Sequence, residues 1–337
     1  MQIIFSCQAN SMDVCLTELL ELDRNIKFIR WIDKGIGIIE VNKDFPSFSE
    51  LIRTSEPVFI RHMFPVYLKI NIYDIEKQTE KILEIIDNEL SEGCIFSLQL
   101  RDISKGGYKN FLNEYITDLC KNKGFELNIS NPDTIISGLI DNESFYMGIS
   151  SAEDNLSCWN GGMHRYQRYE GQISRAEFKL LEAVDEFKII CSEFCQVLDL
   201  GAAPGGWSKV MLDKGMYVTA VDPAEIDKTL SKNSNMVHFR ETVQQFILHN
   251  INQYDIILND MKMDISESCK IMLSLAPYLK ENGLCIMTFK LQEKGKIKQI
   301  NRGLRILGEK YNILHAKQLF HNRSEITVIF DKINGKN

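Results

Sequence analysis

The sequence has no run of about 18 consecutive apolar residues, the length a helix needs to cross a bilayer, so no membrane-spanning helix is expected. The first residues, MQIIFSCQAN, lack a basic segment followed by a long apolar one, so we expect no signal peptide. The nine cysteines include no CxxC pair, and no pair of metal ligands at zinc spacing follows Cys191 and Cys195. We therefore expect free thiols, no metal site and a cytoplasmic protein.

An excess of basic residues is also missing. The 337 residues include 39 Lys+Arg and 46 Asp+Glu, and the formal net charge of −7 is the wrong sign for a typical nucleic-acid-binding protein. The charge is uneven, because the first 250 residues carry −12 and the last 87 carry +5. A polyanion should therefore meet the C-terminal part, unless its basic cluster is only a solvated helix face. This cluster comprises Lys294, Lys296, Lys298, Arg302, Arg305 and Lys310.

The composition and length indicate a globular protein of two domains. The segment 150–173 is rich in Ser, Asn and Gly and has the weakest secondary-structure pattern, which places a boundary there. Before it, strand-like and helix-like runs alternate as β-α-β-β, which predicts α+β layers. After it, apolar strands alternate with helices, which predicts a doubly wound α/β fold with a mostly parallel sheet. The main strands are expected at 195–200, 216–222, 254–260, 283–290, 312–318 and 325–330.

A glycine-rich loop, DLGAAPGG at 199–206, follows the first of these strands and precedes a predicted helix. Small residues let such a loop approach a ligand closely. Asp222 ends the next strand, where a carboxylate can accept both hydroxyls of a ribose. The glycines do not fit the G-x-G-x-x-G dinucleotide pattern, and Asp199 suits a cationic amino group better than a phosphate. The loop predicts S-adenosylmethionine as the ligand; a tight turn without a ligand is the alternative.

Four ionisable residues fall near the carboxyl edge of the predicted sheet. Asp260 and Lys290 each end an apolar strand, Glu325 opens the last antiparallel strand, and Lys179 lies in the helix before the first strand. Burying two lysines with two carboxylates balances charge. Methyl transfer to a sugar hydroxyl needs a base, and a lysine whose pKa is lowered by burial and a second ammonium group suits this role. Taken singly, each residue also fits an ordinary structural role.

The segments SRAEFKLLE, DLGAAPGGWS, ILND, MTFK and SEITVIF follow one another in an order that resembles the FtsJ-like RNA 2′-O-ribose methyltransferases. The resemblance implies a Rossmann-like class I S-adenosylmethionine-dependent methyltransferase domain at 174–337. It also implies that Lys290 is the base and that Lys179, Asp260 and Glu325 assist it. The segments 161–183 and 317–328 are similar to members that methylate a cytidine of large-subunit (23S) rRNA.

The same resemblance implies which residues bind the cofactor. At one position the chain departs from the family, because an aspartate that reaches the adenine usually follows HFRE, whereas this chain has Glu241 and then Thr242. Both therefore remain candidates, and Trp207 is also expected to pack in the first helix of the domain. The expected cofactor-binding residues are Asp199, Gly201, Ala202, Ala203, Pro204, Gly205, Gly206, Trp207, Asp222, Glu241, Thr242 and Asp260.

The N-terminal half is expected to select the RNA. Residues 126–150 resemble a THUMP domain, an RNA-binding module, which gives a ferredoxin-like segment at 1–60, a THUMP-like domain at 61–155 and a linker at 156–173. The expected partner is 23S rRNA or a large-subunit precursor. In HRYQRY (164–169) the tyrosines suit base stacking, although an ordered linker is the alternative. The expected RNA-binding residues are Arg165, Arg168, Arg175, Lys294, Lys296, Lys298 and Arg323.

The sequence therefore predicts an S-adenosylmethionine-dependent RNA 2′-O-ribose methyltransferase of large-subunit rRNA. The alternatives are a non-catalytic RNA-binding ribosome-assembly factor that retains the fold and a small-molecule methyltransferase. An NAD-dependent oxidoreductase is disfavoured by the glycine loop. The sequence specifies neither the target nucleotide nor whether the protein is a monomer or a homodimer.

Overall fold

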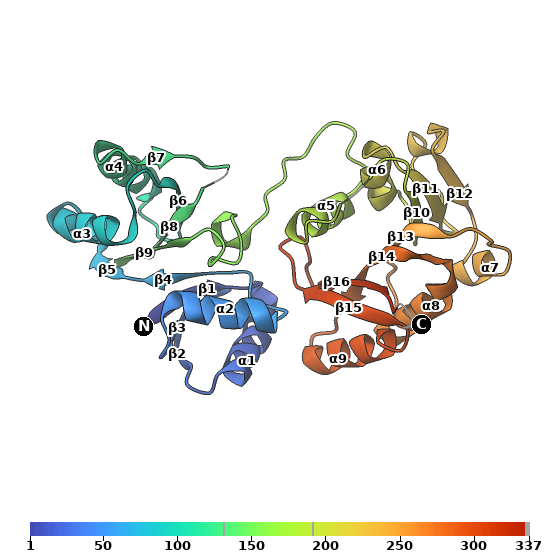
Figure 1. Ribbon diagram of the computed structural model, residues 1–337, viewed down its shortest axis with the longest axis horizontal. Helices are drawn as coiled ribbons and strands as arrows, with labels where there is room; N and C mark the ends of the chain where they lie inside the picture. Colours follow the sequence, from blue (N-terminus) through green and yellow to red (C-terminus); the bar gives the residue numbers. More distant parts are fainter. Residues whose placement is uncertain (131, 191, 334–337) are drawn as a thin grey trace. The chain divides into compact units, whose positions relative to one another are not determined.

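The computed structural model describes residues 1–130, 132–190 and 192–333 (Figure 1). Contacts within the chain divide it into two compact units, Met1–Met163 and His164–Asn337. The division falls inside the segment 156–173 that the sequence predicts to be a linker. Each unit has its own sheets and apolar core, so each is described by itself.

The first sheet of unit 1 is antiparallel, with the strand order β2-β3-β1-β4. Its β-α-β-β-α-β sequence of elements is the ferredoxin-like motif, in agreement with the expected fold class. The predicted boundary after residue 60 differs from the structure, because β4 pairs with β1 and so belongs to this sheet. The elements are β1 (Gln2–Ser6), α1 (Met12–Leu22), β2 (Lys27–Asp33), β3 (Ile36–Glu40), α2 (Phe45–Ser55) and β4 (His62–Val66).

The second sheet of unit 1 has the strand order β5-β9-β8-β6-β7, and β6 runs parallel to both β8 and β7. Two helices pack on it through Ile82 and Ile86 of α3 and Leu112 and Ile116 of α4, which join one buried cluster with the strands. The THUMP assignment of this region stays a prediction. The elements are β5 (Leu68–Asn71), α3 (Thr79–Glu89), β6 (Ile95–Asp102), α4 (Lys109–Asn122), β7 (Glu126–Leu127), β8 (Thr134–Ile140) and β9 (Ser144–Ser151).

Unit 2 is a seven-stranded sheet with the order β12-β11-β10-β13-β14-β16-β15. The first five strands in this order are parallel, whereas β16 is antiparallel to both of its neighbours. The predicted doubly wound sheet is therefore confirmed. Its strands are β10 (Gln196–Leu200), β11 (Tyr217–Val221), β12 (Met236–Phe239), β13 (Tyr254–Asn259), β14 (Leu279–Lys290), β15 (Tyr311–Lys317) and β16 (Glu325–Lys332).

Helices cover this sheet and bury its apolar strands. The order of the strands reverses between β10 and β13, and in open α/β sheets ligands bind outside the carboxyl ends of the strands at such a reversal. The loop after β10 and the residue after β13 therefore lie where a ligand is expected. The helices are α5 (Ala176–Glu186), α6 (Gly206–Asp213), α7 (Val243–Ile247), α8 (Ile265–Leu275) and α9 (Lys296–Leu307).

Three expectations about the whole chain concern membranes, thiols and metals. In the part of the chain that the structure describes, no helix is long and apolar enough to cross a membrane. The eight cysteines in that part are free thiols, and Cys191 lies outside it. The same residues include no group of three or more His, Cys, Asp or Glu side chains that could hold a metal ion.

A glycine fixes the close approach of the two sheets of unit 1. A Cβ atom at Gly148 of β9 would lie 1.8 Å from the carbonyl oxygen of Pro65, and the backbone N–H of Tyr67 donates to Met147 at 3.0 Å. Gly148→Ala should therefore lower the free energy of unfolding by about 2–3 kcal/mol, measured by denaturant titration of the full chain. Gly93→Ala is the control: φ is +77° but no atom is near, so a loss of about 1 kcal/mol is expected. Equal losses in both variants would contradict this packing.

Candidate active site

The two lysines and two carboxylates predicted at the sheet edge form a closed ring of alternating charge. Lys179 Nζ lies 3.1 Å from Asp260 Oδ2 and 2.6 Å from Glu325 Oε1. Lys290 Nζ lies 2.5 Å from Glu325 Oε2 and also donates to Asp260 Oδ1. Each carboxylate thus contacts both lysine amines, and the structure brings the four predicted residues together in one cluster.

The sheet explains why these residues meet. Asp260 directly follows β13 and Lys290 ends the parallel neighbour β14, so both lie at the carboxyl edge. Lys290 is paired in register with Glu325, the first residue of the antiparallel β16. Thr288, two residues before Lys290 on the same face of β14, donates to Asp260 Oδ1 at 2.6 Å. Thr288 is not among the predicted site residues, although its spacing from Lys290 could have indicated it.

The pKa values of two members of the ring, Lys179 and Asp260, are shifted by the charges around them. Burial alone would lower the pKa of Lys179, but the charges of Asp260 and Glu325 outweigh burial and raise it. Burial would raise the pKa of Asp260, but Lys290 and Lys179 hold it below its usual value. The expectation of a lysine pKa lowered by burial is therefore wrong for Lys179. Of the two lysines Lys290 is the more accessible, with 23% of its side chain exposed against 18%.

Helix α5, which carries Lys179, is held by two buried glutamates, one in its first turn and one near its middle. In the first turn, Glu177 accepts from the backbone N–H of Ser174 at 2.8 Å, and Ser174 Oγ accepts from Ala176 N–H at 3.2 Å. One turn further on, Glu182 accepts from the backbone N–H groups of Phe320 and His321, both at 2.7 Å. Burial raises the pKa of Glu182 to about 7, against those two hydrogen bonds. These contacts attach α5 to the loop that leads into β16.

The glycine loop after β10 has the backbone shape of a ligand-binding turn. Gly201 has φ +68° and Gly205 has φ +114°, conformations that favour glycine. Side-chain carbons there would lie 2.5 Å from Met261 Cγ and 2.3 Å from Leu230 Cδ1. The loop continues through Ala202, Ala203, Pro204 and Gly206, which begins α6.

Asp222 meets this loop from the end of β11, as predicted. Its Oδ2 accepts from the backbone N–H of Ala203 at 3.1 Å, and its Oδ1 accepts from Ala224 N–H at 2.8 Å. The side chain is half-buried, so it remains accessible to a ligand lying over the loop. The loop and Asp222 therefore lie at the same edge of the sheet as Asp260.

Two of the residues expected to bind the cofactor support the loop from beneath. Asp199 is 1% exposed and accepts from Ser208 Oγ at 2.6 Å, while burial raises its pKa to about 7. Trp207 belongs to the buried core, where its Nε1 donates to the carbonyl of Ala176 at 2.9 Å. The expected packing of Trp207 is confirmed. Both side chains are thus buried, and neither is exposed at the surface of the loop.

The residues at the expected adenine position have other partners. Thr242 is the N-cap of α7: its Oγ1 accepts from Gln245 N–H at 3.3 Å, and the Gln245 side chain accepts from Thr242 N–H. Glu241 is half-buried and its Oε1 lies 2.8 Å from His249 Nε2. Contact of either residue with adenine stays a prediction.

The site fits S-adenosylmethionine by its chemistry. The glycine turn and the carboxylate of Asp222, which is suited to ribose hydroxyls, lie with Asp260 at one sheet edge. These residues, together with Gly201–Gly206, would hold the cofactor.

The expected RNA-binding residues lie in several places of unit 2. Arg165, Arg168, Arg175 and Arg323 are exposed. The tyrosines of HRYQRY are used within the domain: Tyr166 stacks on Phe178 and His321, with ring centroids 5.6 and 5.5 Å apart, and Tyr169 bonds to Glu177. The prediction that Tyr166 stacks on bases is therefore not supported by its position.

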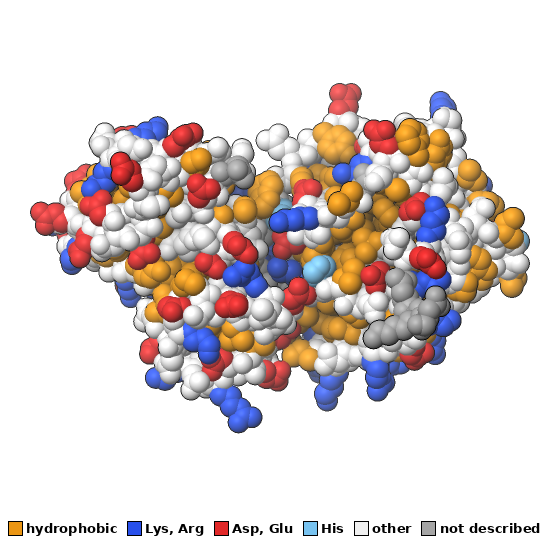
Figure 2. All heavy atoms as spheres, in the orientation of Figure 1, with side chains coloured by type: hydrophobic (Ala, Val, Ile, Leu, Met, Phe, Trp, Pro, Cys, Tyr) orange, Lys and Arg blue, Asp and Glu red, His pale blue; other side chains and the backbone are white. Residues whose placement is uncertain are grey.

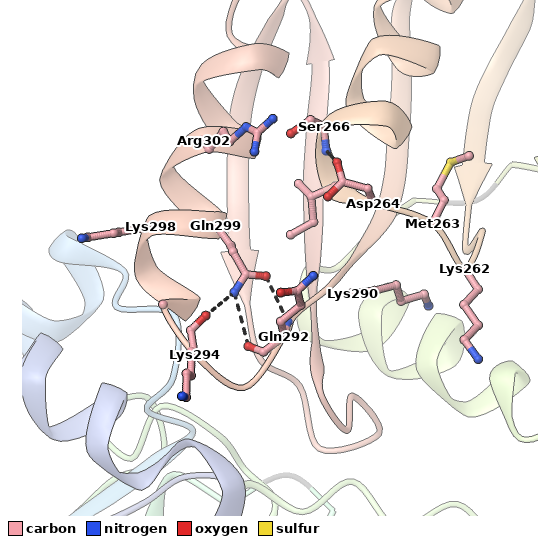
Figure 3. A pocket seen from close by; sticks show the side chains of 12 residues that line it. Lys262, Met263, Asp264, Ser266, Lys290, Gln292, Lys294, Lys298, Gln299 and Arg302 are labelled. Atoms are coloured by element: carbon pink, nitrogen blue, oxygen red, sulfur yellow. Dashed lines mark hydrogen bonds between the residues drawn. The ribbon is translucent and has the colours of Figure 1, made fainter.

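The basic cluster of α9 borders a cavity of about 540 Å³ beside the ring (Figure 3). Lys294 and Lys298 line it, as does Lys290 of the ring. Lys296 is only 5% exposed and does not line the cavity, so its position does not support the predicted contact with RNA. Lys262 also lines the cavity, although it is not among the residues predicted to bind RNA. The cavity is lined by Lys262, Met263, Asp264, Ile265, Ser266, Lys290, Gln292, Lys294, Gly295, Lys298, Gln299 and Arg302.

Comparisons with known proteins agree with this geometry. Residues 172–303 match the FtsJ-like methyltransferase family. An uncharacterized protein of Methanocaldococcus jannaschii is 30% identical over 188 residues, 54% of this chain and 52% of that protein. The ribosomal RNA large subunit methyltransferase M of Sodalis glossinidius is 30% identical over 193 residues, 53% of this chain and 51% of that protein. The chain thus spans about half the length of these curated relatives.

Among solved structures, TrmN from Thermus thermophilus is similar over 99% of this chain and 100% of its own, at 12% identity and a TM-score of 0.39. The similarity of residues 172–303 to FtsJ-like methyltransferases therefore rests on the sequence match.

Asp199 gives the site a testable pH dependence. Its folded-state pKa of about 7 lies above the ordinary 3.8, so the folded state binds the extra proton between these values and loses stability as pH rises through them. Asp199→Asn keeps an acceptor for Ser208 without the charge. Its stability relative to the native protein should therefore increase from pH 4 to pH 7.5, measured by urea denaturation at each pH. A constant difference across this range would contradict the raised pKa.

Proposed function

We propose that the chain is an S-adenosylmethionine-dependent RNA 2′-O-ribose methyltransferase that acts on large-subunit rRNA, since residues 172–303 match the FtsJ-like methyltransferase family. The observation that carries the proposal is the ring of Lys179, Asp260, Lys290 and Glu325 beside the glycine loop. Relatives with the name ribosomal RNA large subunit methyltransferase M support the choice of substrate.

The reaction needs a base because a sugar hydroxyl is a weak acid. S-adenosylmethionine supplies an electrophilic methyl group on a positively charged sulfur. The ribose 2′-oxygen forms the new O–CH₃ bond while the S–CH₃ bond breaks with its electron pair on sulfur, and the hydroxyl proton passes to a lysine amine. S-adenosylhomocysteine and a 2′-O-methylated ribose are the products.

Lys290 is the better candidate for this base. Both lysines contact the same two carboxylates, so their accessibility separates them. Lys290 is more exposed and lines the neighbouring cavity, so a ribose can approach its amine. Asp260 and Glu325 hold both lysines in place, which limits the attack to one geometry.

The proposal extends to the nucleotide, to unit 1 and to the compartment. A cytidine target rests on the resemblance of segments 161–183 and 317–328 to cytidine-specific members of the family. The ferredoxin-like and THUMP-like regions of unit 1 would select the RNA. An enzyme that methylates large-subunit rRNA would act in the cytoplasm.

A non-catalytic ribosome-assembly factor with the same fold is the second candidate. Nothing requires such a factor to keep two lysines and two carboxylates in one ring, because buried ion pairs contribute little net stability. The complete ring therefore favours an enzyme.

Ribose methylation of large-subunit rRNA from cells with and without the gene tests the substrate. We expect one 2′-O-methyl mark, on a cytidine, to disappear from the rRNA of the deletion strain and to return when the native gene is supplied. An unchanged methylation map would contradict the proposal. If the deletion strain instead lacks a methyl group on a base, the protein methylates a base and not the ribose 2′-oxygen.

Lys290→Ala tests the base. Loss of the amine should lower the rate of methyl transfer at least about 10²–10⁴-fold, measured with labelled S-adenosylmethionine and rRNA from the deletion strain. Cofactor binding by calorimetry should persist, and it also reports that the variant is folded. Lys280→Ala, at the other end of the same strand and in a partly exposed ion pair with Asp255, should keep native activity. Native activity in Lys290→Ala would exclude Lys290 as the base.

A further inference from the structure

The cavity beside the ring is strongly cationic. Five of its lining residues are Lys262, Lys290, Lys294, Lys298 and Arg302. Among the residues that the structure describes, no carboxylate forms a salt bridge with Lys262, Lys294, Lys298 or Arg302, whereas Lys290 belongs to the ring. The single acidic lining residue, Asp264, is the N-cap of α8 and accepts from Ser266 N–H at 2.8 Å. The cavity therefore offers uncompensated positive charge.

One wall of the cavity is held in shape by Gln299 of α9. Its Oε1 accepts from Gln292 N–H at 3.0 Å, and its Nε2 donates to the carbonyl of Lys294 at 2.7 Å. The loop that follows Lys290 is thereby fixed to α9 (Figure 3). Arg302 reaches from the next turn of α9 towards Ser266 at the start of α8 (Figure 3). A prearranged wall lowers the entropy cost of binding a charged ligand.

The connectivity of RNA relates this cavity to the ring. The 2′-hydroxyl and the 3′-phosphodiester of a ribose are attached to neighbouring carbon atoms, so a site that holds one lies beside the other. Lys290 belongs both to the ring and to the wall of the cavity. We propose that the cavity binds the phosphate on the 3′ side of the methylated ribose, together with the nucleotide attached to it. This inference rests on the proposed function and names the part of the RNA that the catalytic domain recognises.

The chemistry of the lining fits this ligand. A guanidinium group can donate two parallel hydrogen bonds to phosphate oxygens, and lysines add point charges around them. A volume of about 540 Å³ lies within the range of about 300–1,000 Å³ found for small-ligand sites, which suits a nucleotide better than a lone phosphate. Arg302 and Lys262 are thus positioning residues for the RNA. They reach the cavity from α9 and from the loop after β13.

Arg302→Gln and Lys262→Gln test the inference. With rRNA from the deletion strain as substrate, each should raise the KM for RNA about tenfold, because a hydrogen bond to a charged group is removed. The kcat and the affinity for S-adenosylmethionine should stay within twofold of native. The plot of log affinity against log salt should become shallower by about 0.7 for each single-strand phosphate that the variant no longer neutralises.

Arg305→Gln is the matched control. Arg305 is exposed on the same helix but does not line the cavity, so this variant should keep the native KM and salt slope. If Arg302→Gln and Lys262→Gln behave like Arg305→Gln while methyl transfer proceeds, the cavity inference is overturned and the proposed function stands. If the native protein transfers no methyl group, the proposed function fails, and RNA affinities measured by filter binding still decide whether these residues contact RNA.

A substrate with one neutral phosphate identifies the contact itself. An RNA oligonucleotide that carries a methylphosphonate 3′ to the target ribose should bind the native protein about tenfold more weakly than the unmodified RNA. Arg302→Gln should add less than its full effect to that weakening, because both changes remove the same interaction. Full additivity, or an equal effect from a methylphosphonate several nucleotides away, would overturn the assignment.

Discussion

The ring of Lys179, Asp260, Lys290 and Glu325 is the constraint on which the rest of unit 2 depends. An unpaired charge in a site so shielded from water costs several kcal/mol, so each carboxylate needs both ammonium groups nearby. The four residues come from a helix, two strands and the position that directly follows a third strand, and the sheet must bring them to one edge. Its register is equally strict, because a slip of one residue in β16 would turn Glu325 to the opposite face.

Much of this arrangement follows from the sequence. Apolar runs that end in a charged residue indicate buried parallel strands, and their carboxyl ends share one edge, so Asp260 and Lys290 could be placed together. The spacing from the glycine loop located Asp222 in the same way. The pKa of Lys179 could not be predicted from the sequence. It depends on the distances from Lys179 to Asp260 and Glu325, which only the folded structure sets.

Other features needed the tertiary structure. In unit 1, β4 contains Pro65, which weakens its strand pattern, but β4 is an edge strand, where a missing N–H is tolerated. The composition of the segment that contains Tyr166 is typical of an RNA-binding surface. The ring of Tyr166 nevertheless packs on Phe178. Lys296 belongs to a basic run along α9, and only the orientation of that helix separates it from Lys294 and Lys298.

The net charge of −7 has a different meaning once the units are known. Unit 1 carries −10 and unit 2 carries +3. On the face drawn in Figure 2, acidic and basic side chains of unit 1 are interspersed. Five basic residues of unit 2 line the cavity next to the ring, where their charge would attract a polyanion. RNA selection by unit 1 would then depend on shape and local contacts more than on charge.

Helix α5 does more than carry one lysine. Lys179 and Glu182 are three residues apart and therefore share a face of the helix; one reaches the ring, and the other binds the backbone of Phe320 and His321, shortly before β16 begins. Because a helix has 3.6 residues per turn, one inserted residue between them would rotate the second by about 100°. An insertion between residues 179 and 182 would therefore break the contact of one of these side chains.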